Sequence, residues 1–228
     1  RCRDACSMSS VAEVALGIFG VIAAAAIGSF MCVVIDRMPV ALDEPDEFGD
    51  FYEMRPWSEV AGGTSRCSSC GAPVRWFQNV PVVAWLVLRG RCASCKESIP
   101  AFHPIVELAV PLTAGLYLWA YGLEWRALPA LIAIPGLIAV SAIDLRTLMV
   151  PTRVVWPMFA LVLVVSIAVA FANDQPRWML GGVIGIAILA GPLTLLWFAL
   201  PGAMGFGDVR LAVLLGWILG FESVRERL

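Results

Sequence analysis

Two aspartates, Asp144 and Asp208, stand at the ends of long apolar stretches and are the residues best suited to chemistry. Asp144 ends one stretch, and Asp208 opens another directly after Gly205 and Gly207. Two carboxylates about 3 Å apart cannot both ionise easily, so they share one proton. The ionised carboxylate can take a proton from water while the protonated one polarises a substrate carbonyl. The pair therefore favours an aspartic protease with Asp144 and Asp208 as its catalytic residues.

The two glycines before Asp208 agree with this interpretation. Without side chains at Gly205 and Gly207, an extended substrate backbone can approach the carboxylate closely. The alternative is a plain loop between helices, with each aspartate only capping a helix end or facing water. Two aspartates at the same predicted depth, one beside a Gly-x-Gly turn, make that alternative weaker.

The chain contains one histidine, His103. A Ser-His or Cys-His protease needs a histidine beside its nucleophile, and a zinc protease of the HExxH type needs two. If the protein is a hydrolase, carboxylates are therefore its natural catalytic groups.

Four cysteines form two CxxC pairs separated by 21 residues: Cys67, Cys70, Cys92 and Cys95. Two such pairs suit a tetrahedral zinc ion, with each pair supplying two thiolates from a tight turn. A cytoplasmic location would disfavour disulfides. We expect structural zinc here, and an empty or redox-active CxxC pair remains the alternative.

The composition indicates that lipid is the main solvent of the chain. The 228 residues are 60% hydrophobic and only 15% charged, whereas soluble domains are about half apolar and about a quarter charged. One soluble core could not bury this much apolar surface. The net charge of -2 gives no reason to expect nucleic acid as a partner.

Apolar stretches predict an all-α polytopic membrane protein with about six or more transmembrane helices. The first, residues 11–35, could be a signal peptide, but it is too long for an h-region of about 7–15 residues. The last starts near residue 209, is too short to span fully, and is expected to be incomplete. The predicted spans are residues 11–35, 104–121, 127–143, 154–171, 178–200 and 209–228.

The hydropathy pattern divides the chain into three parts. Residues 1–35 hold an outer end and the first span, residues 36–103 form a polar insert, and residues 104–228 hold the other spans and both aspartates. The insert begins with an acidic run that we expect to be a solvated loop, and then becomes basic and rich in cysteine. We expect it to be the zinc-binding domain.

The distribution of basic residues predicts the orientation. Alternating spans put the insert, the loop at 144–153 and the loop at 201–210 on one side, together with ten of the 16 Lys and Arg residues. The positive-inside rule then places the insert and both aspartates on the cytoplasmic side.

Several further runs, in order along nearly the whole chain, resemble the type IV prepilin peptidases. They include Gly28-Ser29-Phe30 with Arg37-Met38-Pro39, the cysteine loop with Leu88-Arg89-Gly90-Arg91-Cys92, and Pro104-Ile105-Val106-Glu107-Leu108. Asp144-Leu145-Arg146-Thr147 and Gly205-Phe206-Gly207-Asp208-Val209 match the two catalytic motifs of that family. As a set, these matches are highly specific.

The resemblance implies a bifunctional enzyme of the bacterial inner membrane. Members cleave the positively charged leader from type IV prepilins and pseudopilins, after a glycine and on the cytoplasmic side. Many then methylate the new N-terminal residue with S-adenosylmethionine. Asp144 and Asp208 carry over as the catalytic pair, and Gly90, Arg91 and Glu107 as residues of methyl transfer.

Some positions depart from the family pattern. Cys32 stands where Asn is usual, Asp36 where an aromatic residue or His is usual, and His103 where Tyr is usual. Thr152 replaces Asp or Asn, and Arg210 replaces Lys. The first three flank the cysteine insert, so they bear on methylation more than on cleavage.

Three alternatives remain open from the sequence. The protein could be a peptidase without methylation that keeps the insert as structure. It could be a proton-coupled transporter that uses both aspartates as a relay, although transporter carboxylates usually lie near the membrane midplane. It could also be a non-catalytic assembly protein with a zinc docking module, which would leave the paired aspartates unexplained.

Overall fold

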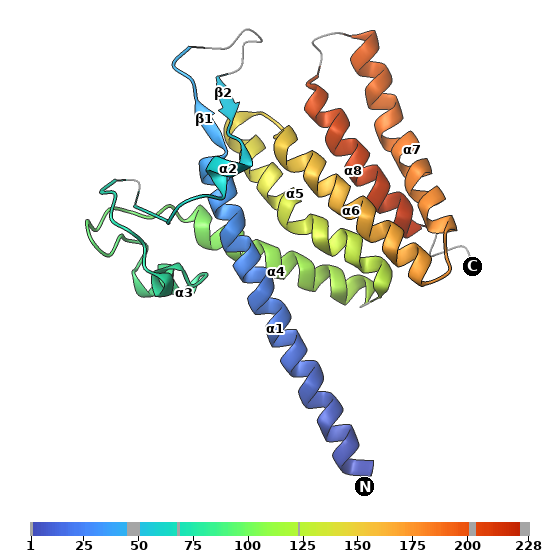
Figure 1. The fold of residues 1–228 in the computed structure, drawn as a ribbon, viewed down its shortest axis with the longest axis horizontal. Helices are drawn as coiled ribbons and strands as arrows, with labels where there is room; N and C mark the ends of the chain where they lie inside the picture. The colour runs from blue at the N-terminus through green and yellow to red at the C-terminus, as the bar shows by residue number, and fades with distance from the viewer. Residues whose placement is uncertain (1, 45–50, 68, 123, 201–203, 224–228) are drawn as a thin grey trace.

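The computed structural model describes residues 2–44, 51–67, 69–122, 124–200 and 204–223, with side chains described from Gly17 onward except for Trp76. Among these residues, long helices dominate (Figure 1). They are α1 (Cys2–Arg37), α4 (Phe102–Tyr121), α5 (Leu128–Thr147), α6 (Thr152–Ala172), α7 (Arg177–Ala199) and α8 (Phe206–Ser223). In lipid, helices satisfy every backbone N–H and C=O within one segment, which is why apolar runs of this length become helices.

Five helical segments in the described part of the chain are long and apolar enough to cross a membrane. They are Gly17–Arg37, Phe102–Tyr121, Trp125–Thr147, Thr152–Ala172 and Arg177–Ala199. These segments confirm the predicted all-α membrane fold. The final apolar stretch forms α8, a helix of 18 residues that is not one of these five.

The helix ends are arranged so that three chain segments meet at one end of the bundle. Helices α5 and α6 run in opposite directions, as do α7 and α8 (Figure 1). The C-terminal end of α5 and the N-terminal ends of α6 and α8 therefore lie at the same end. This is the end of the bundle at which β1 and β2 also lie.

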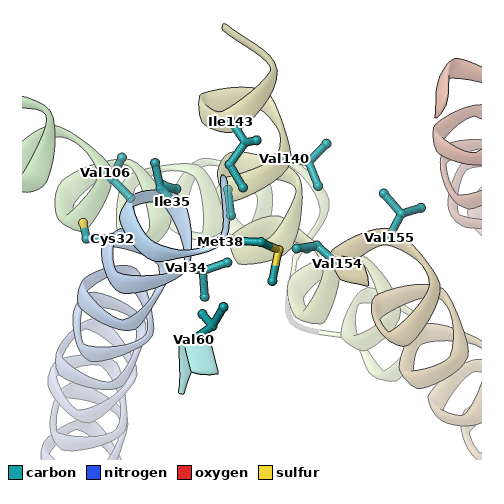
Figure 2. Packing of buried hydrophobic residues seen from close by; sticks show 11 residues of the cluster. Cys32, Val34, Ile35, Met38, Val60, Val106, Val140, Ile143, Val154 and Val155 are labelled. Carbon is teal, nitrogen blue, oxygen red and sulfur yellow. The ribbon is translucent and has the colours of Figure 1, made fainter. Parts of the chain in front are cut away.

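The core below that end joins the last turns of α1 to α4, α5 and α6. Ile35 and Met38 are fully buried there and belong to one cluster with Val140, Ile143 and Val155 (Figure 2). Between helices in lipid, attraction comes mainly from close packing, because lipid tails are as apolar as these side chains. Complementary shape at this junction thus holds the four helices together.

The insert is partly docked over the same end of the bundle. Strands β1 (Pro39–Ala41) and β2 (Tyr52–Met54) pair antiparallel, and helix α2 (Trp57–Val60) follows. The Trp57 indole N–H donates to the backbone carbonyl of Arg153 at 2.7 Å, which fastens α2 to the start of α6. The strand pair was not predicted from the sequence. Of the predicted solvated loop, residues 45–50 lie outside the described residues.

Glycines let α7 and α8 pack with their backbones almost in contact. A Cβ atom added at Gly185 would lie 2.8 Å from the Cα of Gly220, and one added at Gly216 would lie 2.7 Å from the Gly185 carbonyl oxygen. Small residues at such crossings are a common way to bring membrane helices close together. The close packing of α7 against α8 therefore depends on glycine, which has no side chain, at these positions.

We predict that Gly185→Ala destabilises the protein by about 1–3 kcal/mol, because its methyl group would meet backbone atoms that cannot rotate away. Thermal unfolding in detergent measures the loss. The matched control is Gly191→Ala on the same helix, where an added Cβ would have nothing within 4 Å. Equal melting temperatures for the two variants would contradict the proposed glycine packing.

Candidate active site

Asp144 lies in the last turn of α5, a helix that continues past the predicted end of its span at residue 143 to Thr147. The helix is closed by Leu148, whose backbone is left-handed (φ 55°) and whose N–H donates to the Asp144 carbonyl at 2.7 Å. This conformation costs a leucine about 1–2 kcal/mol. A left-handed residue directly after the last turn is a common way to close a helix, and here it fixes the end of α5 just beyond Asp144.

Asp208 lies in the first turn of α8, at the same end of the bundle as Asp144. The two aspartates were predicted to share one membrane boundary; in the structure, the ends of α5 and α8 that carry them lie at the same end of the bundle (Figure 1). Asp144 is half-buried and Asp208 is exposed. Both carboxylates lie at helix ends. The transporter alternative would instead need them near the membrane midplane.

Gly207 brings the start of α8 close to the connection between α5 and α6. A Cβ atom added at Gly207 would lie 2.7 Å from the Cβ of Val150, whereas one added at Gly205 would find its nearest atom at 3.9 Å. Val150 is six residues after Asp144, and Gly207 directly precedes Asp208. The two glycines therefore differ. Gly207 must lack a side chain for α8 to pack closely against Val150, whereas a Cβ atom at Gly205 would meet no close neighbour.

Arg210, in the next turn of α8, also holds the start of this helix in place. Its guanidinium donates to the Thr152 hydroxyl at the start of α6 and lies over the Phe206 ring at 4.7 Å. Its Nε is buried and has no hydrogen-bond partner among the described residues. This contact was not predicted, because Thr152 is 58 residues away along the chain.

Arg146, two residues after Asp144, has a different role. It forms an ion pair of 3.1 Å with Asp36 at the end of α1 and lies 3.8 Å from the ring centre of Phe102 at the start of α4. The other Asp36 oxygen lies 3.3 Å from Nε2 of His103. This polar junction of three helices was not predicted. It links the end of α5 to the two helices that flank the insert.

The four predicted cysteines come together in the insert. The sulfur atoms of Cys67, Cys70, Cys92 and Cys95 all lie within 4.8 Å of one another. Tetrahedral zinc with Zn–S bonds of about 2.3 Å requires S–S separations of about 3.8 Å. The Cys67 and Cys95 sulfurs are 3.8 Å apart. The cluster could therefore hold a metal ion.

The two CxxC turns are built alike. In each, the N–H of the first cysteine bonds to a carbonyl five residues later, and its carbonyl accepts the N–H four residues later. That fourth residue has positive φ in both turns: 70° at Gly71 and 62° at Lys96. Two equivalent turns facing each other are what a four-thiolate site needs.

The pKa values of the cysteine thiols are shifted by nearby backbone N–H groups, by desolvation and by the neighbouring thiols. Backbone N–H groups of Cys70 and Ser69 lower the pKa of Cys67 to about 6. The Glu97 N–H lowers the pKa of Cys95, but desolvation and the neighbouring thiols raise it more, to about 12. Four thiols this close cannot all ionise without a cation, whereas a metal ion would bind all four as thiolates.

The residues carried over for methyl transfer line two cavities. Gly90 (φ 65°) and Arg91 border a cavity of about 550 Å³, and a Cβ at Gly90 would lie 2.8 Å from the Trp85 ring. Glu107 is buried on α4, accepts the Val82 N–H at 2.7 Å, and borders a second cavity of about 580 Å³ between α1, α4 and the insert. Trp85 borders both cavities.

Two protein families match the chain, one in its N-terminal half and one in its C-terminal half. Residues 22–121 match the bacterial peptidase A24 N-terminal domain, and residues 131–225 match the type IV leader peptidase family. A prepilin leader peptidase/N-methyltransferase of Stutzerimonas stutzeri is 34% identical over an alignment of 201 residues, and the alignment covers 83% of this chain and 68% of that protein.

The chain belongs to the type IV leader peptidase family. Another relative of the same name, from Neisseria gonorrhoeae, is 34% identical over 87% of this chain and 72% of its own length. No solved structure matches the chain. In this family member, the cysteine cluster falls in the N-terminal region and both aspartates fall in the leader peptidase region. With its apolar helices, it is a multi-pass membrane protein.

We predict that Gly207→Ala lowers the melting temperature, because its Cβ would push α8 away from Val150. A loss of about 1–3 kcal/mol is typical of such overpacking. Gly205→Ala is the matched control and should change little. Adding Val150→Gly to Gly207→Ala should restore part of the loss, and no restoration would contradict the contact.

Proposed function

We propose that this family member is a membrane-embedded aspartic endopeptidase that cleaves the leader from type IV prepilins or pseudopilins, with Asp144 and Asp208 as its catalytic pair. The observation that carries the proposal is that the end of α5 with Asp144 and the end of α8 with Asp208 lie at the same end of the bundle, within the leader peptidase region. The close contact of Gly207 with Val150 supports it, because it draws the two helix ends together.

The two carboxylates divide the work of peptide hydrolysis. The ionised carboxylate removes a proton from water, and the oxygen of that water attacks the scissile carbonyl carbon. The protonated carboxylate gives its proton to the carbonyl oxygen as the tetrahedral intermediate forms. Collapse of the intermediate breaks the C–N bond, and the leaving amine takes up a proton.

Asp144→Asn and Asp208→Asn should each abolish leader cleavage, because an amide cannot accept or relay the shared proton. The double variant should lose little more activity, since residues that act as one unit are non-additive. Cleavage of a prepilin peptide, followed by mass spectrometry, measures the effect.

The matched control is Asp174→Asn in the turn between α6 and α7, at the opposite end of the bundle. Asp174 is exposed with φ 54°, a conformation that asparagine also tolerates, so cleavage should be unchanged. Near-normal cleavage by folded Asp144→Asn protein would remove Asp144 from the mechanism.

For the insert, we propose one structural zinc ion held by Cys67, Cys70, Cys92 and Cys95. The sulfur separations and the two equivalent turns support zinc over a redox pair. Four thiolates and no open position are typical of structural zinc.

The purified protein should contain about one zinc per chain. Cys70→Ser should lower the zinc content and expose the other three thiols to alkylation, whereas Cys32→Ser, at a buried cysteine of α1, should leave zinc bound. Metal analysis without zinc, together with free alkylation of the four thiols in the folded protein, would refute the site.

Methyl transfer is the second activity that we propose, because the similar proteins are named peptidase/N-methyltransferases. S-adenosylmethionine would supply an electrophilic methyl group to the new N-terminal amine. Gly90, Arg91 and Glu107 would hold the reactants, since all three border adjoining cavities. A pre-cleaved peptide that gains one methyl group supports this activity, and one that does not supports a peptidase alone.

We also propose that the chain lies in the bacterial inner membrane, with the insert and both aspartates facing the cytoplasm. The basic residues near these segments support that orientation. Cysteines introduced at positions 149 and 174 should then react with impermeant reagents from opposite sides, with 149 facing the cytoplasm. Labelling of both from one side would refute the arrangement.

A further inference from the structure

The short helix α3 (Val83–Val87) presents an apolar face on the outside of the insert. Val83, Leu86 and Val87 are 55%, 61% and 75% exposed. Their spacing of i, i+3 and i+4 puts them on one side of the helix. The opposite side is occupied, because the Trp85 indole N–H donates to the Ile99 carbonyl at 3.2 Å. The exposed face is therefore presented by a helix whose other side is fixed.

A hydrogen bond joins the start of α3 to a helix that is long and apolar enough to cross a membrane. Helix α4 has 20 residues and is about 30 Å long, which matches the hydrocarbon thickness of a bilayer. Glu107 lies five residues after Phe102, the first residue of α4, which is about 7.5 Å along the helix axis. The Val82 N–H, directly before α3, donates to the Glu107 carboxylate at 2.7 Å. Helix α3 therefore begins beside the second turn of α4.

In Figure 1, α3 lies to the side of the bundle and away from the end where β1 and β2 lie. Amphipathic helices at a membrane surface bury their apolar face about 5–10 Å into the boundary between headgroups and acyl chains. A helix that begins beside Glu107, in the second turn of a candidate membrane span, is within reach of that region.

Charge on the same part of the insert fits a bilayer with anionic lipids. Arg75 precedes the 3₁₀ turn Trp76–Asn79 that leads to α3, and Arg89 follows α3 directly; both are exposed. Basic residues beside an apolar face are attracted to anionic headgroups, and their long side chains can reach the surface. Lys96 and Arg91 add exposed positive charge nearby.

The backbone around α3 is held in a costly conformation. Val82 has φ 60° and Arg89 has φ 52°, so a left-handed residue lies on each side of the helix. Such a value is a genuine outlier for a β-branched residue such as valine. The hydrogen bond to Glu107 is one of the contacts that hold it.

We propose that α3 is an interfacial anchor whose Val83, Leu86 and Val87 side chains insert into the lipid bilayer beside α4, with Arg75 and Arg89 on anionic headgroups. The cysteine insert is then held against the membrane at two places, at α2 over the helix ends and at α3 in the lipid. This arrangement keeps the cavity between α1, α4 and the insert at the membrane surface. The inference requires a membrane-spanning chain and does not depend on the proposed peptidase activity.

The test places an environment-sensitive fluorescent amino acid at one position at a time in the full chain, reconstituted in nanodiscs of phosphatidylcholine and phosphatidylglycerol. Two quenchers are used separately, lipids brominated near the headgroup end of the acyl chain and lipids brominated near its terminal methyl group, and each position is scored by the stronger quenching of the two. Position 87 is the reporter, and position 83 gives a second measurement on the same face. Position 112, exposed on α4, is the positive control, and position 53, exposed on β2, is the negative control.

We expect quenching at positions 83 and 87 to be at least half of that at position 112 and several times that at position 53. Unchanged zinc content and melting temperature establish that each labelled protein is folded. Quenching at 83 and 87 no greater than at 53 would overturn the proposal. Quenching that arises only after a prepilin peptide is added would also overturn the proposal. The apolar face of α3 would then be part of the substrate-binding site and not an anchor of the free protein.

The charged part is tested with Arg75→Gln and Arg89→Gln together. We expect quenching at position 87 to fall in nanodiscs that contain phosphatidylglycerol and to change little in pure phosphatidylcholine. Equal quenching with and without the two arginines, in both lipid compositions, would overturn the role of the headgroups.

Discussion

The contact between the Gly207 backbone and the Val150 side chain is the constraint on which the candidate active site depends. It joins the residue directly before Asp208 to the connection that follows Asp144. Arg210 makes a second contact one turn later, through the Thr152 hydroxyl at the start of α6. Asp208 is therefore positioned by the packing of its neighbours on both sides. Its own carboxylate stays exposed and available to water and substrate.

The direction in which α8 leaves this contact is set by α7. Glycines at the crossing bring the two backbones together, so α8 has little freedom to tilt without separating from Gly185. Lipid offers no hydrophobic force to drive helices together, so shape has to supply the attraction. The glycines of α7 and α8 and the glycine before Asp208 thus serve one purpose. Each removes a side chain where a helix that carries a functional residue must come close to another segment.

Several positions that depart from the family pattern contact each other in space. Asp36 lies beside His103, and Arg210 donates to Thr152. In both pairs, a residue on one helix that departs from the family pattern contacts another such residue on a different helix. The sequence predicted the aspartates and the cysteines because their signals are local: a hydropathy boundary, a glycine turn and a fixed spacing. It could not predict these partners, or the different roles of Arg146 and Arg210, because they depend on how separate helices are rotated and packed.

The end of α5 shows why the end of an apolar stretch and the end of a helix differ. Hydropathy ends the span at residue 143, where the first charge follows, but the helix continues to Thr147. Hydropathy marks where lipid gives way to water, whereas hydrogen bonding and the left-handed Leu148 mark where the helix stops. Asp144 lies between these two points. A catalytic carboxylate needs access to water and also a fixed position, and sites on helices are more precise than sites on loops. A helix that extends one turn beyond its last apolar residue before the charges provides both, and the ion pair of Arg146 with Asp36 holds that extra turn against α1.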